Sequence, residues 1–140
     1  MKHRLITTLA AAAISMILMS SESSAQNGVN YSDSKYHSIA VGNLISGINS
    51  NNAGLSKSSI YFAGYYRVHE ASSALIKILK DNTKDRWIRV YAALALYNMD
   101  ETGAYTEIQR LANTEGDAKV KNICAAIYAE YLHSLQASAN

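Results

Sequence analysis

The sequence predicts an all-α fold, and more closely a short α-solenoid of about three two-helix repeats. Apolar residues recur at helical spacing in six segments between Lys35 and the C-terminus. Related segments reappear at an offset of roughly 31 to 33 in residue number, a period in the range typical of solenoids. No segment alternates long enough to predict a strand, and the absence of proline suits helices packed as antiparallel pairs.

The expected helices are separated by short polar breaks. In chain order they occupy residues 39–48, 55–68, 71–79, 87–99, 104–111 and 120–135. The breaks are rich in Asn, Asp, Thr and Gly, which cap the start of a helix or end the one before it. Four of these polar breaks span Ser50 to Gly54, Asp81 to Thr83, Asp100 to Gly103, and Asn113 to Asp117.

Residues 1–25 have the layout of a secretory signal peptide. Positive charge in Met1 to Arg4 precedes an uncharged run from Leu5 to Met19, and Ser23 and Ala25 supply the small residues of a cleavage site. The run is shorter than the roughly 20 residues that span a bilayer. We therefore expect cleavage after Ala25, a periplasmic or secreted protein, and no integral membrane segment after processing.

The rest of the chain divides into a leader and one domain. Residues 26–34 are polar without periodicity, which predicts a flexible leader, and residues 35–140 form the repeat domain. The 140 residues are 49% hydrophobic and 17% charged, as in an ordinary globular domain. The 13 basic and 11 acidic residues are spread evenly, which argues against a nucleic-acid partner. A single cysteine excludes an internal disulfide and a zinc site built from several thiolates.

The last two repeats align with each other along both of their helices. Asp85 to Tyr97 lies over Asp117 to Ala129 at an offset of 32, and the helix before each one matches at the same offset. In the first repeat, the segment Leu55 to Gly64 aligns in sequence with Ile88 to Tyr97 of the second repeat at an offset of 33 residues. Small side chains are expected to let the helix axes approach closely, with Cys124 in the small buried position that Ala92 holds one repeat earlier. These small residues are Ala92, Ala93, Ala95, Ala125 and Ala126, and the larger ones expected between the helices are Leu75, Leu79, Ile88, Leu96 and Met99.

The middle repeat resembles a known family. Its residues Ala71 to Asp81, Asp85, Ile88, Arg89 and Ala92 to Leu96 are similar to the HEAT-like repeat of the phycobilisome-lyase type. The resemblance covers about residues 38–135. It implies an all-helical solenoid used for protein binding, and it does not carry over lyase chemistry, because such repeats serve many unrelated partners.

Two charged pairs stand near helix starts. Asp85 and Arg89, and likewise Asp117 and Lys121, are four residues apart, a spacing that favours ion pairs on one helix face. The family resemblance implies that these four residues form a structural charge ladder along the stack.

The catalytic and metal-binding patterns in the sequence favour no enzyme. The chain has no G-x-S-x-G, no glycine-rich phosphate loop and no H-E-x-x-H. Ser32 to Lys35 fits S-x-x-K, but the partner motifs of that chemistry are missing. His37, His69 and His133 lack ligands at helical spacing. We expect no catalytic residue, no metal and no cofactor.

Tyrosine is unusually frequent, with ten residues against one phenylalanine. The helical phase separates one set of side chains from the buried positions and places them on a single exposed face. Because tyrosine is enriched at interfaces, this face is a candidate partner-binding stripe. Its members are Tyr61, Tyr65, Tyr91, Leu94 and Asn98. The alternative is that these rings seal the ridges between repeats.

These patterns favour an extracytoplasmic helical-repeat module that binds a protein partner without catalytic activity. One alternative is a lyase-like auxiliary subunit that binds a small ligand or chromophore in its groove. Another is a structural envelope protein that associates with itself. Tyr128, Tyr131 and Leu132 near the C-terminus predict an open apolar face, so a homodimer also stays an alternative.

Overall fold

A computed structural model describes residues 34–139. The predicted signal peptide, residues 1–25, and residues 26–33 of the predicted leader lie outside the described residues. Ser34, the last residue of that leader, is the first residue of a helix.

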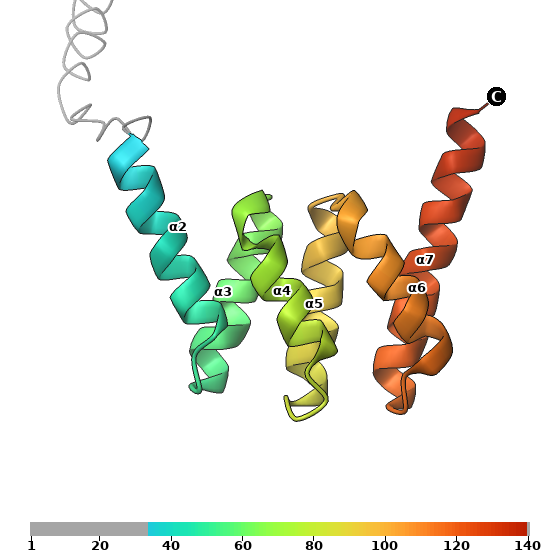
Figure 1. Cartoon of the computed structure of the whole chain (residues 1–140), viewed down its shortest axis with the longest axis horizontal. Coiled ribbons are helices and arrows are strands. Elements are labelled where there is room, and N and C mark those ends of the chain that lie inside the picture. The colour runs from blue at the N-terminus through green and yellow to red at the C-terminus, as the bar shows by residue number, and fades with distance from the viewer. Residues whose placement is uncertain (1–33, 140) are drawn as a thin grey trace, which may run out of the picture. The chain divides into compact units, whose positions relative to one another are not determined.

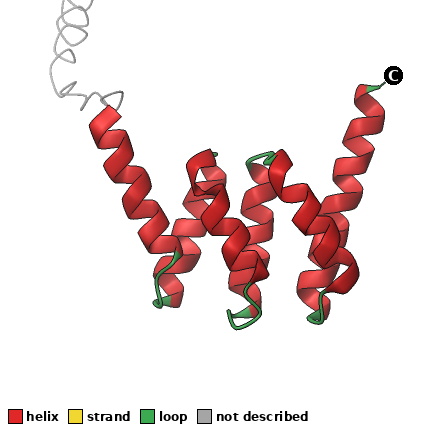
Figure 2. Cartoon of the chain, viewed as in Figure 1, coloured by secondary structure: helices red, strands yellow, loops and turns green. Residues whose placement is uncertain are grey.

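Between residues 34 and 139 the chain is all-helical, without strands (Figures 1 and 2). The prediction of six α-helices is confirmed for this part of the chain. None of these helices is long and apolar enough to cross a membrane. The α-helices are α2 (Ser34–Ile48), α3 (Ala53–Tyr65), α4 (Ser72–Lys80), α5 (Arg86–Asn98), α6 (Tyr105–Thr114) and α7 (Ala118–Ser138), with short 3-10 helices η1 (His69–Ala71) and η2 (Thr102–Ala104).

The helices pack as three consecutive pairs. In each pair the first helix lies against the second: α2 on α3, α4 on α5, and α6 on α7. The second helices also pack against one another in chain order, so that α3, α5 and α7 form a row, which lies behind α2, α4 and α6 in Figure 1. Helix α5 is the middle member of this row and contacts both of its neighbours.

Each helix of the row begins at a capping side chain. The side-chain oxygen of Asn52 accepts a hydrogen bond from the Leu55 amide, and Asp85 and Asp117 accept bonds from two amides each at the starts of α5 and α7. Caps of this kind satisfy amides that have no partner within the helix. Since consecutive caps stand one repeat period apart, the same local signal starts all three helices.

The end of α3 differs from its prediction. Apolar periodicity predicts a helix that runs to Val68, whereas α3 ends at Tyr65 and Arg67 adopts a left-handed conformation with φ 51°. Asp100, which stands one repeat period after Arg67, has the same φ after the end of α5. A left-handed residue stops a helix, and because neither residue is glycine, composition does not reveal the stop at Arg67.

The interior follows the predicted alternation of small and large side chains. Ala92, Ala93 and Ala95 are buried, as predicted. So are all of the larger residues expected between the helices: Leu75, Leu79, Ile88, Leu96 and Met99. At the crossing of α3 and α5, a Cβ atom placed on Gly64 would lie 2.8 Å from the Cα atom of Ala95. The two helix backbones are thus in direct contact there.

The prediction is wrong for Ala125 and Ala126, which are exposed on α7. Ala93, the α5 counterpart of Ala125, is buried, whereas α7 is the last helix of the row within residues 34–139. Leu94, the α5 counterpart of Ala126, is exposed as well. Cys124 is fully buried, as predicted, and burial raises the pKa of its thiol to about 11. A neutral, buried thiol is a poor nucleophile, because the thiolate is the reactive form.

The predicted apolar face near the C-terminus is mostly covered. The ring of Tyr131 stacks on the ring of Tyr105 from α6, with 3.8 Å between the ring centroids. Tyr128 and Tyr131 are only partly exposed and pack against the core, which leaves Leu132 as the exposed member of the predicted set.

Candidate interaction surface

The five predicted binding residues are all exposed and come from neighbouring helices of the row. Tyr61 and Tyr65 lie on α3, and Tyr91, Leu94 and Asn98 lie on α5. On each helix they lie away from the buried side chains, as the predicted helical phase requires. Their role in binding stays a prediction.

Aromatic contacts along α3 join the predicted tyrosines to two further rings, Phe62 and Tyr66, that lie outside the predicted stripe. Tyr61 stacks on Tyr65 at a centroid distance of 5.7 Å and meets Phe62 edge to face at 5.6 Å. Tyr66 stacks on Phe62 and meets Tyr65 edge to face at 5.0 Å. Such contacts add about 0.5 to 1.5 kcal/mol per pair and restrict ring motion. The exposed rings of α3 are therefore ordered by one another.

A shallow hollow of about 280 Å³ lies between α3 and α5. Tyr61 and Phe62 line it from α3, Tyr91 lines it from α5, and Lys57 and Ser58 complete the lining. Its lining thus combines aromatic surface with the charged group of Lys57.

Trp87 extends the exposed apolar surface of α5 by one helical turn. It is exposed four residues before Tyr91, and the Lys119 ammonium lies 5.6 Å from its ring centroid. Trp87 was not predicted as a surface residue, although its spacing of four residues from Tyr91 places both on one side of the helix. We call the exposed set Tyr61, Tyr65, Trp87, Tyr91 and Leu94 the aromatic face.

Asn98 does not share the hollow of the tyrosines. It lines a separate hollow of about 370 Å³. That hollow also contains Tyr105, whose hydroxyl donates to Asp100 at 3.4 Å and whose pKa is raised to about 12, mainly by burial. The five predicted residues thus lie on neighbouring helices but do not converge on one site. The other residues of this second hollow are Arg67, Tyr97, Asp100, Glu130, Tyr131 and Ser134.

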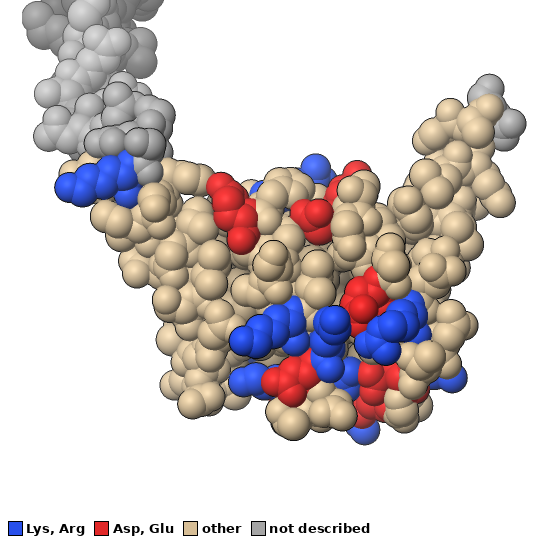
Figure 3. Space-filling model, viewed as in Figure 1, with Lys and Arg blue, Asp and Glu red and all other residues tan. Residues whose placement is uncertain are grey.

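The face formed by α2, α4 and α6 has a different character. Basic and acidic side chains lie next to one another over its central and lower part (Figure 3). Glu107 contacts both Arg110 and Lys80, the latter at 3.9 Å. Because charges of opposite sign alternate here, this face offers no continuous basic surface to a polyanion.

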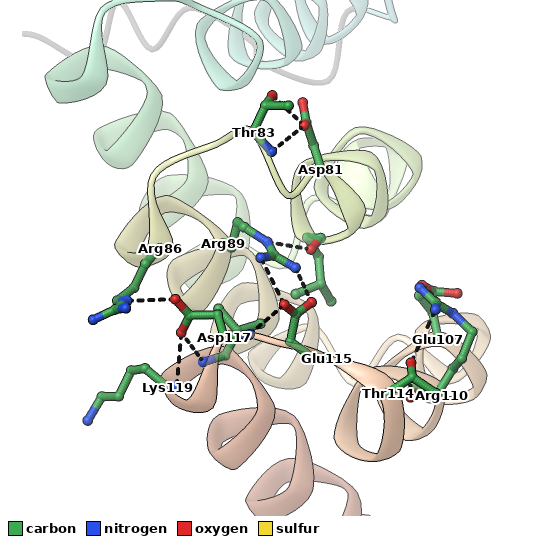
Figure 4. Close-up of polar contacts among 12 residues, drawn as sticks. Asp81, Thr83, Arg86, Arg89, Glu107, Arg110, Thr114, Glu115, Asp117 and Lys119 are labelled. Atoms are coloured by element: carbon green, nitrogen blue, oxygen red, sulfur yellow. Dashed lines mark hydrogen bonds and ion pairs between the residues drawn. The ribbon is translucent and has the colours of Figure 1, made fainter.

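The predicted pairing of Arg89 is wrong. Its Nε donates to the carbonyl oxygen of Leu79 at 3.0 Å, and both of its terminal nitrogens donate to the carboxylate of Glu115 (Figure 4). The expected partner, Asp85, caps its own helix instead. Arg89 is buried, so this bidentate pair joins the interior of α5 to the loop before α7.

The predicted pairing of Asp117 is wrong for the same reason. One oxygen of Asp117 caps α7, and the other accepts from Nε of Arg86 at 2.8 Å, while Lys121 is exposed (Figure 4). A capping carboxylate turns back to the first amides of its helix and away from a side chain four residues later. Both ion pairs, Arg89 with Glu115 and Arg86 with Asp117, join α5 to the segment before α7. Of the four residues of the predicted ladder, only Arg89 and Asp117 take part in them.

Glu115 was missed as a partner of Arg89. The equivalent position one repeat earlier is Thr83, so the repeat period contains no signal for it. Only the packing of α5 against the following loop identifies it.

Two histidines bridge neighbouring helix pairs at one edge of the domain. His37 Nε2 lies 2.9 Å from a Glu70 oxygen, and His69 Nδ1 lies 3.2 Å from a Glu101 oxygen, which also accepts from Ser72. Within residues 34–139, no group of three or more His, Cys, Asp or Glu side chains is placed to hold a metal ion.

Acid is expected to destabilise the fold through these carboxylates. The Arg89 guanidinium lowers the pKa of Glu115, and hydrogen bonds from Ser72 and His69 lower that of Glu101. A carboxyl group with a lowered pKa in the folded state contributes stability above its unfolded pKa of about 4.5. That stability is lost as the pH falls through the folded value. Urea unfolding followed by circular dichroism between about pH 7 and about pH 3 measures the loss.

The variant Glu115→Gln serves as the comparison for this titration. It removes the ionisable group, so its free energy of unfolding should change less with pH below about 4.5 than that of the parent. An identical pH dependence of the two proteins would contradict the assignment of Glu115.

Comparisons with known proteins identify no relative of this chain. No family model, no curated protein and no solved structure matches it.

Proposed function

We propose that the chain is a short α-solenoid of three two-helix HEAT-like repeats that serves as an extracytoplasmic protein-binding module without catalytic activity. The repeat assignment is supported by contacts that recur at the repeat spacing. Ser56 donates to the carbonyl of Ile48 at 2.9 Å, just as Arg89, at the equivalent position of the next repeat, donates to the carbonyl of Leu79. The location is supported by the signal-peptide pattern of residues 1–25.

The observation that carries the proposed activity is the aromatic face. Large exposed aromatic side chains from two adjacent helices are unusual on an isolated soluble protein and mark interaction sites. Tyrosine and tryptophan contribute most strongly to protein interfaces, because they combine a large apolar area with a polar group and few rotatable bonds. The row of packed helices holds these rings on a rigid support.

Affinity capture followed by calorimetry tests this proposal. The chain, expressed from its full-length sequence, is used as bait in the extracytoplasmic fraction of its source, and the affinity for any captured polypeptide is then measured. The triple variant Tyr61→Ala, Tyr65→Ala, Tyr91→Ala should bind at least about tenfold more weakly, since interface tyrosines often contribute more than about 1 kcal/mol each.

A double variant, Tyr36→Ala and Leu135→Ala, is the matched control. Both side chains are exposed and apolar but lie on α2 and at the end of α7, away from the aromatic face. Circular dichroism should show both variants to be helical. Equal affinity of the triple variant and the parent would refute the assignment of this face. A copurifying small molecule with no protein partner would favour the lyase-like alternative.

A further inference from the structure

Among the described residues, 34–139, no helix precedes α3 in the row formed with α5 and α7, so this row is open on one side of α3. At an offset of 33, three α3 side chains take the positions of Ile88, Ala95 and Met99 in α5. Those α5 residues are only 6%, 4% and 1% exposed. Their α3 counterparts, Leu55, Phe62 and Tyr66, are 52%, 46% and 68% exposed.

Contacts in the structure identify what these positions face. Gly64 of α3 lies against Ala95, so the Ala95 side of α5 is the side turned to the preceding helix of the row. Phe62 takes the position of Ala95 in α3. The exposed side of Leu55, Phe62 and Tyr66 is therefore the side on which a preceding helix would pack, and we call it the α3 open side.

Helix α7 has the converse open side. Asn122, Ala125 and Ala129 take the positions of Val90, Ala93 and Tyr97 of α5 at an offset of 32. Tyr97 takes the position of Gly64, the α3 residue that meets the next helix of the row, so this side of α5 corresponds to the side turned to α7. Val90 and Ala93 are buried. All three α7 counterparts are exposed. We call Asn122, Ala125 and Ala129 the α7 open side.

The two open sides complement each other in size, and both are uncharged. The α3 open side presents large apolar side chains, and the α7 open side presents small ones. Well-packed helix contacts set large residues against small ones. Neither set contains a charged residue, as in the cores of protein interfaces. Pairing α3 with α3 would oppose large side chains, and pairing α7 with α7 would bring only small ones together.

We propose that a second copy of this chain occupies these surfaces, with the α3 open side of one copy packed on the α7 open side of the next. The contact would continue the row of helices already present within one chain. Because it joins two different surfaces, it leads to an open chain of copies or to a ring rather than to a two-fold dimer. This self-association does not require the proposed partner binding, and the two surfaces adjoin at Phe62, which also lines the hollow beside Tyr61.

Complementary single-site variants test the proposal by sedimentation velocity at increasing protein concentration. Leu55→Glu blocks the α3 open side, and Ala125→Glu blocks the α7 open side. Both residues are exposed, so both variants should fold, as circular dichroism would verify. Gln109→Glu is the control. Gln109 is an exposed residue of α6, so this substitution adds the same charge outside both open sides.

The parent and the Gln109→Glu control should show a mass that rises above the monomer with concentration. Each blocked variant alone should stay monomeric, because it lacks one of the two required sides. Their equimolar mixture should form a dimer and nothing larger, since one intact side of each kind remains. A monomeric parent would overturn the proposal, as would a monomeric mixture or association of either blocked variant alone.

Discussion

Arg89→Ala is expected to lower the free energy of unfolding by about 3 to 5 kcal/mol, the usual effect of removing one partner of a buried ion pair. Arg89 is only 3% exposed. Its loss leaves the largely buried Glu115 carboxylate without its guanidinium and the Leu79 carbonyl without the donor that Arg89 supplies. Urea unfolding followed by circular dichroism measures the change.

Arg110→Ala is the matched control for this prediction. Arg110 is also paired with a carboxylate, that of Glu107, but its side chain is 51% exposed. Exposed ion pairs contribute about 0 to 1 kcal/mol, because solvent screens them. Equal losses in the two variants would contradict the view that the buried bridge from α5 to the Glu115 loop holds the last two helix pairs together.

Gly64→Ala is expected to cost about 3 kcal/mol, the upper end of the range for overpacking. The added Cβ atom would lie 2.8 Å from Cα and 2.9 Å from Cβ of Ala95. A backbone atom cannot rotate away as a flexible side chain can, so α3 and α5 must move apart. The same denaturation experiment measures the effect.

Gly42→Ala provides the control for the loss of a helical glycine. Gly42 lies inside α2, and a Cβ atom there would meet nothing within 4 Å. Alanine is the better helix former, so this variant should gain about 0.5 to 1 kcal/mol. The two substitutions are chemically identical and should have opposite signs. A stabilised Gly64→Ala protein would show that the two helices are not in close contact.

Both predictions concern the packing of α5. This helix packs on α4 in its own pair and lies between α3 and α7 in the row. The proposed binding function depends on this arrangement, because the aromatic face is shared between α3 and α5. A substitution that separates these two helices should also displace Tyr61 from Tyr91.

By itself the sequence determined the six helices, the polar breaks between them, and most of the side chains that are buried. These features are local. Apolar periodicity reports which side of a helix avoids water, and a capping side chain bonds to amides two or three residues away. The exposure of Tyr61, Tyr65 and Tyr91 and the burial of Cys124 follow from the same phase.

Only the tertiary structure decided which groups meet across helix pairs. Glu115 pairs with Arg89, and Arg86 with Asp117, because the loop before α7 packs against α5. The repeat period of the sequence does not predict the contact between this loop and α5.

The tertiary structure also decides which side chains are exposed at the two ends of the row of helices α3, α5 and α7. Ala125 and Ala126 repeat a pattern that is partly buried in α5, yet both are exposed on α7. Periodicity shows that a side chain can pack against a neighbouring helix. Whether a neighbouring helix exists depends on where the row stops.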